Sequence, residues 1–133
     1  NKLVDDLLEL MKKNKMDYTN TFADISFNNL NENEIYESEE FKKWEIRWKD
    51  ILDNQDGNIE LAKLKMKQSN PGIIPRNNLV EQALSEAVNN NDYTFYKQLL
   101  KNLLSSYEHE LIDKEFKKAP VMPLKPYKTY CGT

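Results

Sequence analysis

The chain of 133 residues has few of the residues from which many functional sites are built. It contains a single cysteine, Cys131, and a single histidine, His109. One cysteine cannot form an internal disulfide, and one cysteine with one histidine cannot supply a four-ligand zinc site or a CxxC redox motif. These counts favour a reducing, intracellular compartment.

Glycine and long apolar runs are also scarce. Three glycines, at positions 57, 72 and 132, cannot form a glycine-rich phosphate-binding loop of any recognised spacing. No apolar run approaches the roughly 18 to 20 residues that span a bilayer, and no signal segment is visible. The net charge of −3 is spread along the chain, with lysine pairs beside acidic residues, which disfavours nucleic-acid binding. We therefore predict a protein that binds neither membranes nor nucleic acids.

The polar residues do not assemble into a recognisable catalytic or metal-binding motif. A calcium loop with Gly57 at its sixth position would place Lys63 where a bidentate glutamate is required. His109 lies between two glutamates and is predicted to be a solvated side chain. Paired carboxylates along the chain have no apolar pocket or basic partner that would make them share a proton. We predict no catalytic, cofactor-binding or metal-binding residue in the chain.

What is present is a series of amphipathic helical patterns, which predict an all-α fold. With 39% hydrophobic and 31% charged residues, the chain is expected to have a thin core. Trp44 and Trp48 lie on one helical stripe and are predicted to be core residues rather than a ligand platform. Thr19 or Asn20 is the expected cap of the second helix, and Ser38 that of the third. The patterns predict helices over residues 2–14, about 20–27, 38–52 and 59–68.

The second half of the sequence predicts an antiparallel helix pair over about residues 78–105, because the link at 89–91 is very short. Asp92 is the expected cap of its second helix, and a weaker helix is predicted over 108–117. Three prolines spaced by three residues then favour an extended tail. We divide the chain into a helical region, 1–118, and a C-terminal tail, 119–133. The tail prolines are Pro120, Pro123 and Pro126.

Several separated segments of this sequence resemble the selenoprotein O (SelO/YdiU) family of kinase-like protein adenylyltransferases. The resemblance covers nearly the whole chain, with its segments in one order. The chain also opens at Asn1 inside a helical pattern, as expected for a piece of a longer polypeptide. The segments that carry the resemblance include Leu7-Leu8-Glu9-Leu10-Met11, Asp17-Tyr18-Thr19-Asn20-Thr21-Phe22, Phe41-Lys42-Lys43-Trp44, Ser69-Asn70-Pro71, Ile74-Pro75-Arg76-Asn77, Val80-Glu81-Gln82-Ala83-Leu84 and Tyr130-Cys131-Gly132-Thr133.

This resemblance implies a parent enzyme with a protein-kinase-like fold, a pseudokinase. Such an enzyme binds ATP in a reversed orientation with Mg²⁺ or Mn²⁺ and transfers AMP to Ser, Thr or Tyr hydroxyls of proteins. The nucleotide, metal and catalytic residues of the family lie upstream of the matched region, so none is carried over. The resemblance therefore implies a C-terminal region that is non-catalytic alone and is structural or regulatory in a bacterial cytoplasmic enzyme. Its partners would be the kinase-like N-terminal part of the same protein and, for the parent, protein substrates.

Three residues receive roles from the resemblance. Family members carry cysteine or selenocysteine near the C-terminus, and Cys131 matches that position as a candidate redox residue. Arg76 and Asn77 are expected to cap adjoining helix ends or to tie this region to the kinase-like lobe, since arginine offers five fixed donors. If the chain is part of a longer enzyme, it is expected to expose apolar surface when isolated. The alternative that the residues leave open is an autonomous helical module that binds another protein through the tail or through the Leu99 to Leu104 face.

Overall fold

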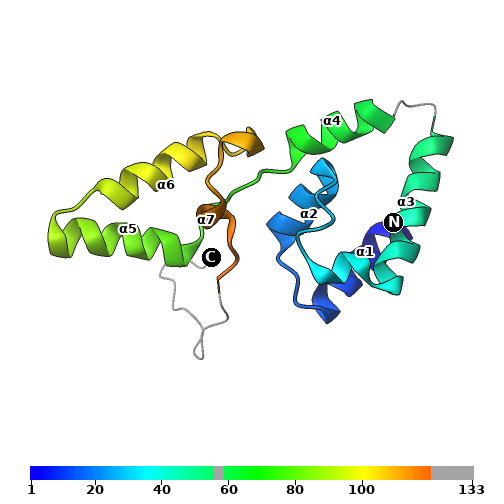
Figure 1. The fold of residues 1–133 in the computed structure, drawn as a ribbon, viewed down its shortest axis with the longest axis horizontal. Coiled ribbons are helices and arrows are strands. Elements are labelled where there is room, and N and C mark those ends of the chain that lie inside the picture. The colour runs from blue at the N-terminus through cyan, green and yellow to red at the C-terminus, as the bar shows by residue number, and fades with distance from the viewer. Residues whose placement is uncertain (56–58, 121–133) are drawn as a thin grey trace.

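The computed structural model describes residues 1–55 and 59–120, and all regular structure in these ranges is helical (Figure 1). The predicted all-α class is confirmed. None of the helices in these ranges is both long enough and apolar enough to cross a bilayer. Predictions for Pro123, Pro126 and Cys131 lie outside the described residues. The helices in chain order are α1 (Lys2–Lys13), α2 (Tyr18–Phe27), 3₁₀ helix η1 (Glu34–Glu37), α3 (Glu39–Asn54), α4 (Ile59–Ser69), α5 (Asn77–Asn90), α6 (Thr94–Leu104), 3₁₀ helix η2 (His109–Leu111) and α7 (Lys114–Lys117).

Side-chain caps define the starts of the N-terminal helices. Ser38 accepts a hydrogen bond from the Phe41 N–H at 3.2 Å, as predicted for the start of α3. The predicted cap of α2 at Thr19 or Asn20 is wrong. Asp17 caps this helix by accepting from the Asn20 N–H at 2.9 Å, an arrangement that also places a carboxylate at the positive end of the helix dipole.

The predicted helix over residues 108–117 is broken in two. Ile112 and Asp113 have extended backbone between η2 and α7. The Asp113 N–H donates to the Asn102 side-chain oxygen at 2.7 Å, so it is satisfied without a helical carbonyl. Asp92 is likewise not the cap residue of α6, since Tyr93 takes that position and the Asp92 side chain accepts from the Thr94 N–H.

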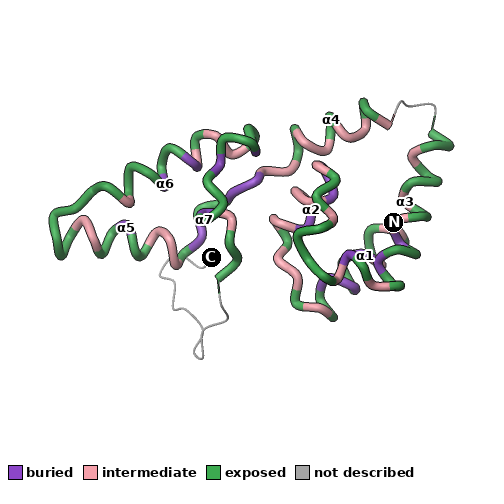
Figure 2. The backbone as a smooth tube through the Cα atoms, in the orientation of Figure 1, coloured by how far each residue is buried: buried purple, intermediate pink, exposed green. Residues whose placement is uncertain are grey.

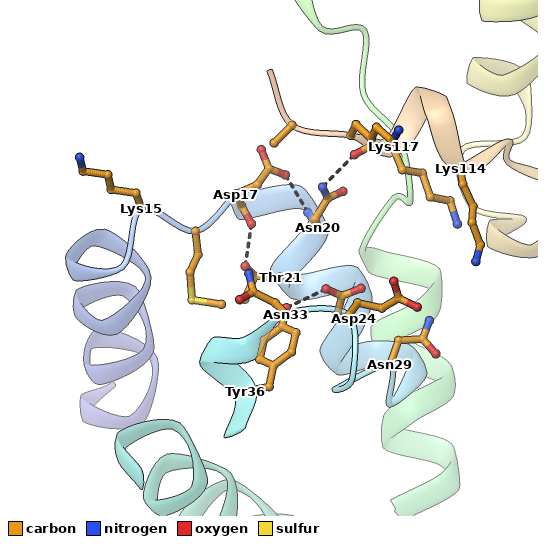
Figure 3. Close-up of a pocket in the computed structure, with 14 residues that line it drawn as sticks. Lys15, Asp17, Asn20, Thr21, Asp24, Asn29, Asn33, Tyr36, Lys114 and Lys117 are labelled. Atoms are coloured by element: carbon orange, nitrogen blue, oxygen red, sulfur yellow. Dashed lines mark hydrogen bonds between the residues drawn. The ribbon is translucent and has the colours of Figure 1, made fainter. Parts of the chain in front are cut away.

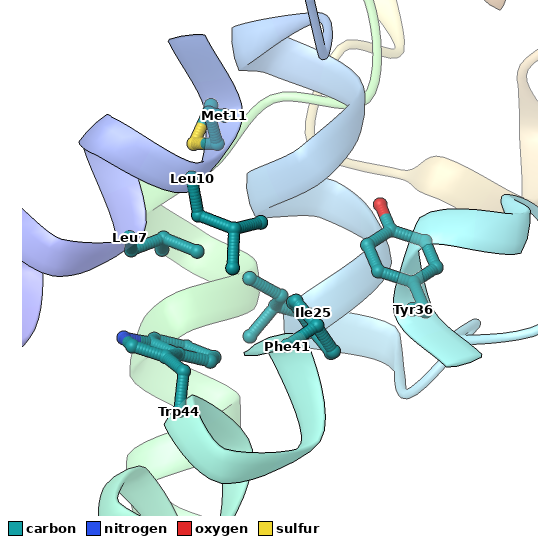
Figure 4. Close-up of a cluster of buried hydrophobic side chains, with 7 residues drawn as sticks. All are labelled: Leu7, Leu10, Met11, Ile25, Tyr36, Phe41 and Trp44. Carbon is teal, nitrogen blue, oxygen red and sulfur yellow. The ribbon is translucent and has the colours of Figure 1, made fainter. Parts of the chain in front are cut away.

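The first half of the chain folds around an aromatic core, which we call the N-terminal cluster (Figure 4). Trp44 donates its indole N–H to the Leu3 carbonyl oxygen at 2.8 Å and stacks against Trp48 at 5.8 Å. The core prediction for the tryptophans is confirmed, since Trp44 is buried and Trp48 packs partly buried against the cluster. The buried members of the cluster are Leu7, Leu10, Met11, Ile25, Tyr36, Phe41 and Trp44.

The second half has a smaller core, the C-terminal cluster. The predicted antiparallel packing of α5 against α6 is confirmed (Figure 1). Ala83 is the buried residue of α5 and Leu99 the buried apolar residue of α6, and Leu79, Val80 and Leu103 pack partly buried against their cluster. The buried members of the cluster are Ile73, Ala83, Leu99, Ile112 and Phe116.

Residues 70–76 connect α4 to α5 and run between the two clusters (Figure 2). As predicted, α4 ends at Ser69, before Asn70-Pro71. Gly72 and Ile73 in this segment are buried, as is Arg76. The connection is therefore part of the packing between the two halves.

Candidate functional site

An ion pair between Asp17 and Arg76 joins the two clusters. Arg76 Nη1 and Nη2 donate to Asp17 Oδ1 and Oδ2, each at 2.7 Å. Two parallel bonds between a guanidinium and a carboxylate fix orientation as well as distance. The side chains are only 7% and 20% exposed for Arg76 and Asp17 respectively. Such a shielded, bidentate pair is a defined structural link between helices that are far apart in sequence.

The pair connects the first turns of two helices. Asp17 caps α2, and Arg76 directly precedes α5 but makes no side-chain capping bond to it. Burial raises the pKa of the Asp17 carboxyl. Hydrogen bonds from Arg76 and from the Asn20 N–H, together with the Arg76 charge, outweigh burial and hold that pKa below its ordinary value.

Two asparagine side chains add hydrogen bonds across the same boundary. Asn20 Nδ2 on α2 donates to the Lys117 carbonyl oxygen at 2.8 Å. Asn70 Nδ2 donates to Ser26 Oγ at 3.1 Å and also to the Met66 carbonyl oxygen. Together with the ion pair and His109, these groups form what we call the junction, whose residues are Asp17, Asn20, Asn70, Arg76, His109 and Lys117.

His109 is buried in the junction, which corrects the prediction that it is solvated. It is 5% exposed, and its Nε2 lies 2.7 Å from the Asn70 carbonyl oxygen. Because a carbonyl only accepts, Nε2 is the donor and carries the proton of the neutral ring. The imidazole stacks on Phe27, with ring centroids 4.1 Å apart. The two flanking glutamates gave no indication of burial, because the apolar surface that covers the ring is Phe27 of α2.

The environment of His109 opposes its protonation. Burial lowers its pKa, and the positive charges of Lys117 and Lys67 act in the same direction. The hydrogen bond to Asn70 and the charge of Glu110 oppose this shift but do not outweigh it. His109 is therefore a neutral packing and hydrogen-bonding residue near neutral pH.

Gly72 permits the close approach of the connecting segment to η2. Its N–H donates to the Ser106 carbonyl oxygen at 2.7 Å. A Cβ atom at this position would lie 2.8 Å from Ile112 Cδ1 and 3.1 Å from His109 Cγ. Glycine therefore avoids a clash with the Ile112 side chain and crowding against the His109 ring.

A pocket of about 510 Å³, lined mainly by polar and charged residues, lies beside the junction (Figure 3). Its walls come from both halves of the chain, namely from the α1–α2 link, α2 and η1 on one side and from α7 on the other. Side chains of both charges face it, including Lys15, Asp24, Lys114 and Lys117. Within residues 1–55 and 59–120, no group of three or more His, Cys, Asp or Glu side chains is arranged to hold a metal ion.

Tyr36 and Asp24 form one wall of this pocket. Tyr36 Oη donates to Asp24 Oδ2 at 2.7 Å. Burial and this bond raise the pKa of Tyr36 well above its usual range, and burial raises the pKa of Asp24 against the opposing effect of the same bond. Tyr36 therefore stays protonated near neutral pH, and the pair acts as a fixed polar wall.

The residues singled out from the sequence are distributed unevenly. Arg76 lies in the junction, and Asn77 is the exposed first residue of α5. Cys131 lies outside the described residues. The sequence patterns did not identify Asp17 as a cap or as the partner of Arg76. Its capping role could have been found from its position directly before the apolar residues of α2. Nothing in the local sequence of Tyr36 or His109 indicates that either is buried.

The fold and the junction define an all-helical unit in which two small cores are held together by buried polar contacts. A sequence model described as protein adenylyltransferase SelO matches residues 1–104, from the first residue to the last residue of α6. The chain therefore belongs to the SelO family.

Curated relatives agree with this assignment. The chain is 42% identical to the protein nucleotidyltransferase YdiU of Bacillus cereus (strain ATCC 10987 / NRS 248) over 131 residues. It is also 42% identical to the proteins of the same name from Bacillus anthracis (strain CDC 684 / NRRL 3495) and Clostridium botulinum (strain Alaska E43 / Type E3). Each match covers 98% of this chain but only 27% of the relative. No solved structure matches the chain significantly.

Proposed function

We propose that this chain is the C-terminal helical region of a SelO-type enzyme that transfers AMP from ATP to Ser, Thr or Tyr hydroxyls of proteins. The observation that carries the proposal is the 42% identity, over 98% of the chain, to proteins named protein nucleotidyltransferases. In this proposal the region is itself non-catalytic and has a structural or regulatory role in the parent enzyme.

The reaction would be carried out by the rest of the parent chain. A protein hydroxyl oxygen forms a bond to the α-phosphorus of ATP, the bond from that phosphorus to the β-phosphate oxygen breaks, and pyrophosphate leaves while the hydroxyl loses its proton. The kinase-like N-terminal part would hold ATP and Mg²⁺ or Mn²⁺. The length relation supports this division, since the chain spans 27% of the relatives that it matches.

The junction supports a structural role for the region. The bidentate Asp17–Arg76 pair and the buried His109–Asn70 bond fix the two clusters in one arrangement. A fixed arrangement of helices is suited to bracing a neighbouring domain, because little conformational entropy is then lost on docking. A cytoplasmic location and a redox role for Cys131 stay predictions, and the relatives named above are bacterial.

The test is a protein adenylylation assay with three proteins: the full-length parent, the parent without the residues equivalent to this chain, and this chain alone. ATP labelled at the α-phosphate is compared with ATP labelled at the γ-phosphate, in the presence of Mg²⁺ or Mn²⁺. We expect label from the α-position only, in the full-length parent, with reduced transfer after deletion and none by the chain alone. Parallel reactions with the other nucleoside triphosphates determine the base preference.

Two results would overturn the proposal. Transfer by the 133-residue chain alone would require a nucleotide site within it. Unchanged transfer and unchanged stability of the parent after deletion would instead favour the autonomous protein-interaction module, which needs no contact with the catalytic part.

A further inference from the structure

The α5–α6 hairpin exposes apolar side chains along most of its length. Val88 on α5 is 80% exposed and Leu104 on α6 is 78% exposed. Leu84 and Leu100 are exposed as well. Tyr93, at the start of α6, and Tyr96 in its first turn are also exposed. Contiguous exposed apolar surface of this kind marks an interaction site in most soluble proteins.

Helical spacing places these side chains on one side of the hairpin. On α5, Leu84 immediately follows buried Ala83, which faces α6. On α6, Leu100 immediately follows buried Leu99, which faces α5. Along an α-helix, each residue's side chain points 100° further around the axis than the one before it. Viewed along the axis, this turn runs clockwise in one helix of an antiparallel pair and anticlockwise in the other. Equal one-residue offsets on the two helices therefore point to the same side.

The opposite side of the hairpin is already covered. Phe95 packs against Phe116 of α7 with ring centroids 5.5 Å apart, and Asn102 binds both the backbone and the side chain of Asp113. Phe95 and Asn102 lie on the other side of α6 from Leu100 by the same spacing argument. We call the uncovered side the hairpin face, defined by Leu84, Val88, Tyr93, Tyr96, Leu100 and Leu104.

The first half of this chain does not cover the hairpin face. Figure 1 shows α5 and α6 extending away from α1–α4, with the link between the two helices at the far end. Figure 2 colours most residues of these two helices as exposed. A covering surface must therefore come from outside the described residues, 1–55 and 59–120, of the same copy.

We infer that the hairpin face docks on the part of the parent polypeptide that lies outside this chain, a claim that rests on the proposed origin of the chain in a longer nucleotidyltransferase. Each relative named above has 73% of its length outside the match, since the match covers 27%. The SelO family model includes the whole hairpin and ends at Leu104, so this surface belongs to the part of the chain shared with the complete enzymes. The partner surface is correspondingly apolar and takes leucine, valine and tyrosine side chains.

Hydroxyl-radical footprinting of the full-length parent tests the inference without requiring activity. The oxidation rates of Tyr96, Leu100 and Leu104 are compared with the rates of the same side chains in a proteolytic digest. We expect these residues to react about tenfold more slowly in the intact parent, because docking excludes solvent from the face. Rates close to those of the digest would overturn the inference.

Footprinting over a range of protein concentrations, with the oligomeric state followed by light scattering, tests whether a second copy covers the face. Protection in the monomer supports docking within the parent. Protection that appears only when the protein dimerises would overturn it in favour of a self-associating face. Nucleotidyl transfer by the same preparation is recorded separately, so failure of the proposed function and failure of this inference give different results.

A charge placed on the face provides a second measurement. Leu100→Glu combined with Leu104→Glu is introduced into the parent, and Ser85→Glu combined with Gln98→Glu, at exposed polar positions of the hairpin outside the hairpin face, is the control with the same change in net charge. We expect the first pair to lower the melting temperature of the parent by about 5 °C and to abolish the footprint, because docking would require burial of unpaired charges and is therefore lost. The control pair is expected to leave both unchanged. An equal effect of the two pairs would contradict the inference.

Discussion

The two halves of this chain differ in how they use their apolar residues. The N-terminal cluster encloses its largest side chains, with Phe41 fully buried and Tyr36, Phe41 and Trp44 in contact through their rings. In the α5–α6 hairpin, by contrast, leucines at regular helical spacing remain exposed. Strong amphipathic patterning of a helix therefore does not by itself show which of its surfaces is buried in a core. A helix face patterned for burial is equally a face patterned for a partner.

The enclosed core of the first half is expected to show the largest mutational effect. Phe41→Ala removes a side chain that is 0% exposed and leaves a cavity between α1, α2 and α3. We expect a loss of about 3 to 5 kcal/mol in the free energy of unfolding, measured by chemical denaturation of the chain. The control Ile46→Ala, on the same helix but 60% exposed, should change stability by less than about 0.5 kcal/mol. Similar losses in the two variants would show that the N-terminal cluster is not the stabilising core.

The junction should contribute the next largest effect. Asp17→Ala leaves the buried Arg76 guanidinium without its carboxylate, and we expect a loss of about 2 to 3 kcal/mol in the free energy of unfolding. The control is Asp6→Ala, because Asp6 makes an ion pair of the same 2.7 Å distance with Arg47 at a more exposed position. That control should cost less than about 1 kcal/mol. Equal costs would mean that burial of the junction pair does not affect its strength.

Because packing around Gly72 is close, Gly72→Ala is expected to lower the free energy of unfolding by about 1 to 3 kcal/mol. Gly72→Ala places a Cβ atom 2.8 Å from Cδ1 of buried Ile112, so the Ile112 side chain must move within a packed cluster. Ile112→Val removes that Cδ1 atom. The double variant should therefore recover part of the loss in a double-mutant cycle, while the 3.1 Å approach to His109 Cγ remains. Strict additivity of the two changes would contradict the proposed clash.

The pH dependence of stability should reveal the burial of His109. Its folded-state pKa lies below the ordinary value of 6.5, so the unfolded chain binds the proton more readily. Stability is then full above about pH 6.5 and falls as the pH decreases toward the folded-state pKa. The charges of Lys117, Glu110 and Lys67 also act on the ring, and the test leaves these three residues unchanged. His109→Gln should flatten the curve below about pH 6.5, as measured by thermal unfolding, whereas an unchanged slope would assign it to other groups.

The loss from Asp17 falls in a different pH window. Its folded-state pKa is below the ordinary value of 3.8, so its contribution to stability is present above that value and is lost as the pH falls through the folded-state pKa. The contributions of the two residues to stability can therefore be separated in one titration. The His109 contribution is lost at weakly acidic pH and the Asp17 contribution at strongly acidic pH. Asp17→Asn should remove the second step and leave the first.

Sequence patterns were most informative where the deciding interactions are local. The bounds of α1, α3 and α4 were close to those predicted, because apolar periodicity, the Ser38 cap and the Asn70-Pro71 stop act within a few residues. Burial of His109 could not be predicted, since it depends on Phe27 and on the Asn70 carbonyl, 39 residues away in the chain. Which apolar positions of α5 and α6 stay exposed could not be predicted individually, because periodicity identifies an apolar surface but not what covers it.

The smallest expected effect concerns that same face in the isolated chain. Leu104→Glu should change the free energy of unfolding of the 133-residue chain by less than about 0.5 kcal/mol, because the side chain is 78% exposed. In the parent the same change should be markedly destabilising, since the side chain is then in contact with a partner surface. Leu99→Ala, at a buried position of the same helix, should be costly in both proteins. A large loss from Leu104→Glu in the isolated chain would show that the hairpin face is already covered there and would remove the contrast between the two halves.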